Sequence, residues 1–187
     1  MLTAHAPAGY AVSKLAVWMR WIPESCASPR TVIGVGVVAA LLPDLDMIYF
    51  LTIDQRQHLH HSYWTHIPLF WVAVCCGAGA ACFFLRRRHM IPLVVLAGVN
   101  LLLHCFLDTI VAGILWHKPF SHRYTVFAEV PNAYPYTALN FILHWTFALE
   151  VLIWLAAVTM FAWEKRTHKR RAIQIPQAPF SDPQSCQ

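Results

Sequence analysis

The stretch Asn100-Leu-Leu-Leu-His104-Cys-Phe-Leu-Asp108 decides the fold, because it places three polar side chains inside an apolar run from about residue 90 to residue 116. In an α-helix, residues four apart lie on one face, so the amide, imidazole and carboxylate should point the same way. The run is long enough to cross a bilayer. Polar groups at that depth cost several kcal/mol unless they face protein, water or a metal. We therefore expect a membrane-spanning helix whose polar face binds a metal that other helices help to coordinate.

The composition is that of a membrane protein. Of the 187 residues, 58% are hydrophobic and only 12% are charged, which is unlike a soluble domain. The length fits one domain. The net charge of +5 sits in short clusters between apolar runs rather than along a continuous basic face. These clusters are typical of membrane topology signals, and we expect no nucleic-acid partner.

Five apolar segments predict an all-α, polytopic membrane helix bundle with four to five transmembrane helices. They cover approximately residues 1–22, 31–53, 67–85, 90–116 and 138–163. The first segment is interrupted by Lys14 and Arg20, so it either crosses the membrane or lies at the interface. Residues 1–171 should form a single transmembrane domain. Residues 172–187, rich in Pro and Gln, should form a disordered cytoplasmic tail.

The basic clusters predict the orientation of the helices. Residues 86–88 and 165–171 are rich in Lys and Arg, so they and the C-terminus should be cytoplasmic. The loops at residues 54–66 and 117–123 then face outwards. In a bacterial inner membrane, this outer side is the periplasm.

Four polar residues from different segments lie at one depth. His104, Asp44, Glu150 and His5 each lie 13 to 15 residues from the cytoplasmic end of their segment. At 1.5 Å per residue, each is about 20 Å into the membrane. The sequence therefore predicts one polar layer, open to the outer side.

The residue types of this layer fit a divalent metal. Imidazole and carboxylate together suit zinc, manganese or iron, while the lack of a cysteine ligand pattern argues against a closed structural zinc. We predict seven candidate metal ligands: His5, Asp44, Asp46, His61, His66, His104 and Asp108. Seven donors exceed one tetrahedral shell, so either two ions bind, or one ion binds and some carboxylates orient the imidazoles.

Pro43 bears on two of these ligands. Asp44 and Asp46 would point to opposite sides of a regular helix. A proline disturbs the preceding helical turn, so we expect both carboxylates to approach one cavity.

Several motifs, in order, resemble those of the YdjM-like family of bacterial inner-membrane proteins. They are His5, Pro43-Asp44-Leu45-Asp46, the pair His61 and Thr65-His66, His104-x-x-Leu107-Asp108, and Pro119-Phe120. The resemblance covers approximately residues 3–121. That family is described as membrane-bound metal-dependent hydrolases, and it is distantly similar to the zinc-dependent phospholipase C and P1-nuclease group, whose helical folds hold metals with His and Asp. The resemblance implies metal binding and hydrolysis for this chain.

Each candidate has a plainer interpretation. A single buried His or Asp can be a hydrogen-bonded residue of the bundle, and His61 and His66 can be solvated loop residues. We expect His58 and His60 to be exposed to solvent. Asn100 is expected to donate to a metal ligand rather than bind the ion.

The leading functional hypothesis is metal-assisted hydrolysis of a phosphate or acyl ester in a lipid or lipid-linked substrate. A divalent metal lowers the pKa of bound water and neutralises charge on the attacked group. Asp46 or Glu150 is the candidate acceptor of the water's proton, although Glu150 can also simply bond a neighbouring helix. Lys118, His122 and Arg123 either hold an anionic headgroup or keep their loop soluble.

Two other hypotheses belong to different classes. A divalent-metal or proton translocator would use the same residues as a pathway, but it needs polar groups through to the cytoplasm. The inner half of the segments looks almost wholly apolar, which disfavours this hypothesis. The third is a non-catalytic membrane protein stabilised by its metal.

Overall fold

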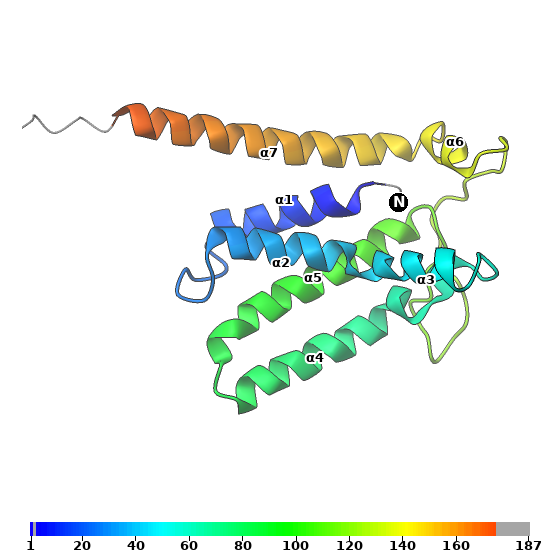
Figure 1. The fold of residues 1–187 in the computed structure, drawn as a ribbon, viewed down its shortest axis with the longest axis horizontal. Coiled ribbons are helices and arrows are strands. Elements are labelled where there is room, and N and C mark those ends of the chain that lie inside the picture. Colours follow the sequence, from blue (N-terminus) through cyan, green and yellow to red (C-terminus); the bar gives the residue numbers. More distant parts are fainter. Residues whose placement is uncertain (2, 175–187) are drawn as a thin grey trace, which may run out of the picture.

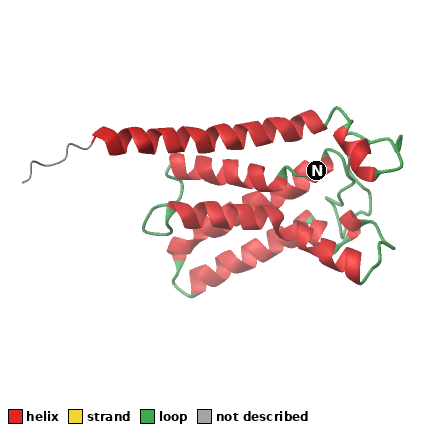
Figure 2. Cartoon of the chain, turned by 45° about the horizontal axis from the view of Figure 1, so that its top comes forward, coloured by secondary structure: helices red, strands yellow, loops and turns green. Residues whose placement is uncertain are grey.

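The computed structural model describes residues 1 and 3–174, and its regular elements are helices, apart from a single β-bridge between Ile114 and Thr125. This confirms the all-α prediction for the described residues (Figures 1 and 2). The elements are α1 (His5–Trp18), α2 (Pro29–Leu41), η1 (Leu42–Leu45), α3 (Asp46–Thr52), η2 (His60–Ser62), η3 (Trp64–His66), α4 (Pro68–Phe84), η4 (Arg88–Met90), α5 (Ile91–Thr109), α6 (Thr137–Ile142) and α7 (Phe147–Gln174).

The helices pack side by side. α1 contacts α2 and α7, α2 contacts α5, and α5 contacts α4, so α7 and α4 form the two edges (Figure 1). Apolar clusters fill the contacts between α1, α2 and α5, with Leu96 and Val32 fully buried. Figure 2 shows the loops gathered at the two ends of the helices.

Among the described residues, three helical stretches are long and apolar enough to cross a membrane: Pro29–Thr52, Arg88–Thr109 and Phe147–Thr167. The helix α4 is apolar but has 17 residues, and α1 has 14. The structure thus gives three candidate spans rather than the expected four to five. α7 continues to Gln174, three residues into the predicted tail, and residues 175–187 lie outside the described part of the chain.

Two helices differ from the sequence prediction. α5 ends at Thr109, seven residues before the expected end at residue 116. There the chain reverses, and Ile114 and Thr125 exchange two backbone hydrogen bonds of 3.0 Å. The Trp116 indole then donates to the Thr109 hydroxyl at 2.8 Å, which fixes the reversal. The segment expected at residues 138–163 is split, because residues 143–146 separate α6 from α7.

Two glutamates join α7 to the N-terminal part of the chain. The Thr3 backbone N–H and hydroxyl donate to Glu150 Oε2, at 2.7 and 2.9 Å. Near the other end, Glu164 contacts the ammonium of Lys14 on α1, whose side chain is buried. α1 thus buries one charged side chain near this end of the bundle.

α1, α2 and α5 approach one another closely around Gly36 of α2. A Cβ atom on Gly36 would lie 1.6 Å from Ser13 Oγ of α1 and 3.2 Å from Asn100 Nδ2 of α5. Both polar side chains are fully buried. Glycine is required here because a larger residue would push α1 and α5 away from α2.

Candidate metal centre

Four side chains from three parts of the chain converge at the end of the bundle that carries η1 and η3, which we call the loop end. Asp44 comes from η1, His66 from η3, and His104 and Asp108 from α5. One ligand atom from each lies within 4.8 Å of the others. His66, His104 and Asp108 are buried, while Asp44 is partly exposed. We call these four residues the His/Asp cluster.

The distances within the His/Asp cluster fit one tetrahedral ion. His104 Nε2 lies 3.1 Å from Asp108 Oδ2, 3.6 Å from Asp44 Oδ1 and 3.4 Å from His66 Nε2. His66 Nε2 lies 3.6 Å from Asp44 Oδ1 and 3.7 Å from Asp108 Oδ2. Zinc binds nitrogen and oxygen at about 2.0–2.2 Å, so its tetrahedral ligands lie about 3.3–3.6 Å apart. The four residues can therefore hold a divalent metal.

The hydrogen bonds of the two imidazoles also favour a cation. His104 Nδ1 lies 2.8 Å from the Ala40 carbonyl oxygen, which only accepts, so Nδ1 carries the hydrogen. His66 Nδ1 similarly donates to Asp46 Oδ2 at 3.0 Å. In the neutral rings, both Nε2 atoms then present lone pairs to each other and to two carboxylates. Only a bound proton or a metal ion makes such an arrangement favourable.

Local sequence explains how these side chains reach one point. His104 and Asp108 are four residues apart on α5, so they share a face as expected. Pro43 is buried where α2 gives way to the 3₁₀ turn η1, and the Asp44 and Asp46 side chains both reach His66. The expectation that the two carboxylates approach one cavity is wrong, because they line different cavities. The Trp71 indole of α4 donates to the Thr65 carbonyl oxygen at 2.6 Å and holds η3 in place.

Asp46 lies behind His66 rather than within the His/Asp cluster. Its Oδ2 accepts hydrogen bonds from His66 Nδ1 and from the Thr65 hydroxyl. Its Oδ1 lies 3.2 Å from His60 Nδ1. Asp46 is thus placed to fix the orientation of the His66 ring.

His60 is the residue that the sequence analysis missed. Its expected exposure is wrong: its side chain is only 11% exposed, and its Nε2 lies 3.5 Å from Asp44 Oδ1. His60, His61 and His66 form a second group whose ligand atoms lie within 4.8 Å of one another. The sequence signal that could have found His60 is its place beside His61 in a histidine-rich loop. His58 is 67% exposed, as predicted.

His61 and His5 flank the His/Asp cluster. His61 Nε2 lies 3.5 Å from Asp108 Oδ2, and His5 Nε2 lies 3.1 Å from Asp108 Oδ1. The His5 ring stacks on His104 with ring centroids 3.9 Å apart. Asp108 also contacts the α-amino group of Met1.

Glu150 and Asn100 bond elsewhere. The described contacts of Glu150 include both donors of Thr3, which matches its plainer interpretation as a residue that bonds a neighbouring segment. Asn100 Nδ2 donates to the Leu96 carbonyl oxygen at 2.9 Å, one turn below His104, rather than to a residue of the His/Asp cluster.

The pKa values of His61 and His66 are shifted in opposite directions. Burial lowers the pKa of His66, but the neighbouring Asp44 and Asp46 carboxylates outweigh it and raise the pKa to about 9. Burial lowers the pKa of His61, although the hydrogen bond with Asp108 opposes this shift. Positive charge is therefore favoured at His66, between the two carboxylates.

A cavity of about 430 Å³ opens beside the His/Asp cluster. Asp44, Asp108, His60 and His61 form its polar wall. The loop residues Lys118, His122 and Arg123 are not among the residues that line it. His122 and Arg123 are exposed, and Lys118 is half-buried.

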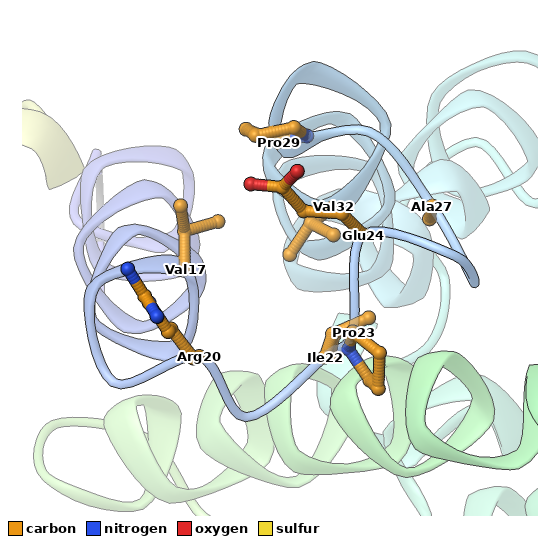
Figure 3. A pocket seen from close by; sticks show the side chains of 8 residues that line it. All are labelled: Val17, Arg20, Ile22, Pro23, Glu24, Ala27, Pro29 and Val32. Carbon is orange, nitrogen blue, oxygen red and sulfur yellow. The ribbon is translucent and has the colours of Figure 1, made fainter.

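A second cavity lies at the opposite end of the helices. It measures about 350 Å³ and is formed by the loop between α1 and α2. Figure 3 shows Arg20 and Glu24 on its wall, with apolar side chains around them. It has no imidazole or cysteine among its described lining residues, so it does not resemble the metal centre.

Comparison with known proteins gives one family. The family model described as YdjM inner membrane protein matches residues 1–173. No curated protein and no solved structure matches the chain.

Proposed function

We propose, given that the chain belongs to the YdjM inner membrane protein family, that it is a metal-dependent hydrolase embedded in the membrane. Its substrate would be a phosphate or acyl ester in a lipid or lipid-linked molecule. The observation that carries the proposal is the convergence of four ligand atoms, two of whose residues, Asp44 and Asp108, also line an open cavity. A similarity in chemistry to the zinc-dependent phospholipase C and P1-nuclease group belongs to the same proposal.

The His/Asp cluster would hold one divalent metal, with zinc the best fit and manganese or iron as alternatives; a second ion would have to be held without His66, because His66 Nδ1 bonds Asp46 and its Nε2 belongs to the cluster. When bound, the metal supplies a Lewis acid that activates water and neutralises charge on the ester. The Ala40 carbonyl and Asp46 hold His104 and His66 with Nε2 facing inwards. Fixed rings bind a metal without first losing side-chain freedom.

His60 and Asp46 form the proposed proton acceptor. His60 lines the cavity, and its Nδ1 lies 3.2 Å from Asp46 Oδ1. A proton taken up by the His60 ring would be stabilised by the Asp46 carboxylate. Glu150 is less favourably placed for this role because it bonds Thr3. For Lys118, His122 and Arg123, contact with an anionic headgroup stays a prediction.

The orientation is also part of the proposal. The basic residues 86–88 and the Lys/Arg-rich end of α7 would be cytoplasmic, so the His/Asp cluster would open towards the periplasm. The apolar helix α4, which packs along α5, would cross the membrane as a further span.

The test is metal-dependent turnover by the purified protein in lipid nanodiscs. Metal-stripped protein is reloaded with zinc, manganese or iron and supplied with a broad panel of phospholipids and lipid-linked phosphates. We expect release of phosphate, headgroup or fatty acid only after reloading. His104→Ala should bind no metal and show no release, while His58→Ala, a change at an exposed histidine outside the centre, should behave like wild type. Full metal occupancy without any release across the panel would contradict the proposal and leave a non-catalytic, metal-stabilised protein.

A translocator is the second candidate, because polar residues continue below the centre. Asn100, Ser13 and Lys14 are buried, and Lys14 contacts Glu164. Such buried polar residues in a membrane are typical of ion pathways. Zinc or proton flux into reconstituted vesicles, abolished by Lys14→Met, would support this candidate over the hydrolase.

A further inference from the structure

We propose that the apolar cavity behind the Pro43 turn is the binding site for an alkyl chain of the substrate. The inference rests on the proposed hydrolase function, and it names the residues of the protein that would select the lipid tail of the substrate. The cavity measures about 610 Å³, within the range of small-molecule sites. Its apolar and aromatic wall is made by Leu42, Leu45, Tyr49, Tyr63, Trp64 and Trp71.

This apolar cavity, which we call the chain cavity after the alkyl chain that it would bind, is in direct contact with the metal centre. Asp46 and Thr65 belong to its wall, and the Thr65 hydroxyl donates to Asp46. Asp46 in turn accepts the hydrogen bond of His66. One carboxylate therefore separates the apolar wall from an imidazole of the His/Asp cluster.

The chain cavity and the polar cavity of about 430 Å³ flank the same short turn. Asp44 lies on the wall of the polar cavity, and Asp46, two residues on, lies on the wall of the chain cavity. An amphiphile would therefore straddle η1, with its ester and headgroup beside His60 and Asp108 and its tail among the aromatic side chains.

The chemistry of the wall selects an alkyl chain. Among the described residues that line this cavity, none is basic, and the one charged side chain, Asp46, is already hydrogen-bonded. An anionic headgroup would find no partner there. Leu45 and Trp64 are each 58% exposed, and Leu45 belongs to the candidate span Pro29–Thr52. The opening of the cavity would therefore face the hydrocarbon tails of membrane lipids, and a lipid tail could enter it directly.

Two substitutions of opposite effect test the chain cavity. Leu45→Trp adds bulk to its wall, and Tyr49→Ala removes bulk. Ile48→Trp is the matched control, because Ile48 lies in the same span, is 65% exposed and is not part of the wall. The probe is a homologous series of n-alkyl phosphates, bound to zinc-loaded protein in nanodiscs and measured by native mass spectrometry.

We expect the wild-type binding to strengthen with chain length until the cavity is full. The plateau should move to shorter chains in Leu45→Trp and to longer chains in Tyr49→Ala, while Ile48→Trp follows the wild type. Zinc content and melting temperature, measured on each variant, establish that the fold is retained. Identical chain-length profiles in all four proteins would overturn the inference.

Photolabelling gives a readout that needs no variant. An alkyl phosphate carrying a diazirine near the end of its chain should label the wall residues of the chain cavity in the wild-type protein. Labelling confined to other apolar surfaces would overturn the inference.

The two proposals fail separately. If Leu45→Trp and Tyr49→Ala change neither ester release nor its chain-length preference, the proposal of the chain cavity fails and the proposal of a hydrolase stands. If binding depends on chain length but no ester is hydrolysed, the proposal of a hydrolase fails and the proposal of the chain cavity stands.

Discussion

Single hydrogen bonds decide what the metal centre can hold. The Ala40 carbonyl and the Asp46 carboxylate accept hydrogen bonds from Nδ1 of His104 and His66, so Nε2 of each ring faces inwards, where it can take a proton or a metal ion. With the opposite tautomers, the same histidines could donate to Asp44 and Asp108 in ordinary hydrogen bonds. The backbone carbonyl of Ala40 is the decisive partner because it can never act as a donor.

Alanine substitutions at three histidines should distinguish a metal ligand from the proton acceptor. His104→Ala should lose the ion of the His/Asp cluster, because a ligand atom is gone. His60→Ala should keep this ion but lower turnover by about 100- to 10,000-fold, since a positioned proton acceptor is removed. His58→Ala should change neither quantity. Metal content by elemental analysis, measured beside turnover, checks all three. A fall from two ions to one in His60→Ala would instead make His60 a ligand of a second ion.

The ionisation of Asp54, at the start of the histidine-rich loop, should make the stability of the protein depend on pH. It accepts from the His58 N–H at 3.0 Å and lies 2.6 Å from His58 Nδ1. Burial raises the pKa of Asp54, but the hydrogen bonds from His58 and Tyr63 outweigh it and lower the pKa to about 2. In the unfolded chain the value is about 3.9, so the ionised carboxylate stabilises the fold above about pH 4 and loses this effect as the pH falls through 2.

Asp54→Asn should therefore melt at a lower temperature than wild type at pH 7, and the difference should shrink between about pH 4 and pH 2. Thermal unfolding followed by circular dichroism at several pH values measures this. Glu24→Gln, at an exposed acidic residue, is the control and should show no such trend. A difference that stays constant down to pH 2 would show that the Asp54 charge does not matter.

At the scale of elements, a break in a helix is as important as the helices. The candidate span Pro29–Thr52 contains the turn η1, and this turn sends Asp44 to one cavity and Asp46 to the other. An unbroken helix would leave the two carboxylates about 200° apart around its axis. The proline thus produces the site at the expense of helix regularity.

The packing of α1, α2 and α5 around Gly36 makes a matched pair of glycine substitutions informative. Gly36→Ala should destabilise the protein by about 1–3 kcal/mol, because the new Cβ would overlap Ser13 Oγ. Gly34→Ala, on the same helix with no neighbouring atom within 4 Å of its Cβ position, should be neutral or slightly stabilising. Urea or thermal unfolding in one detergent compares the two. Equal effects would show that the helices do not approach closely at Gly36.

At the scale of the whole molecule, the proposed metal would join elements that lie far apart in the sequence. η1, η3 and α5 each supply ligand atoms, and the His5 ring of α1 stacks on His104. Two glutamates fasten α7 to the N-terminal residues, so its attachment does not depend on the ion.

Metal removal should accordingly loosen the loop end of the bundle. Zinc at 100 times its dissociation constant would stabilise the folded protein by about 2.7 kcal/mol, so chelation should lower the melting temperature by several degrees. His104→Ala should not respond to the chelator. Differential scanning fluorimetry with parallel zinc analysis provides the measurement. An unchanged melting temperature after complete zinc loss would show that the ion does not link the elements.

The sequence by itself determined the helical class and the polar layer. Spacing along a helix fixes a face and a depth, because both follow from the rise and turn per residue. His5, Asp44 and His104 were placed at one level in this way, and the structure brings these side chains within 4.0 Å of one another or into ring contact. The effect of Pro43 on the helix was also readable from the sequence.

Only the tertiary structure decided which groups at that level meet. Depth is a single coordinate, so it could not separate Glu150, which bonds Thr3, from Asp44, which joins the His/Asp cluster. It could not show that α5 ends at Thr109, that His60 turns inwards, or that Lys14 pairs with Glu164. These outcomes depend on lateral packing and on loop conformation, where side chains distant in sequence compete for the same partners, and no local periodicity encodes that competition.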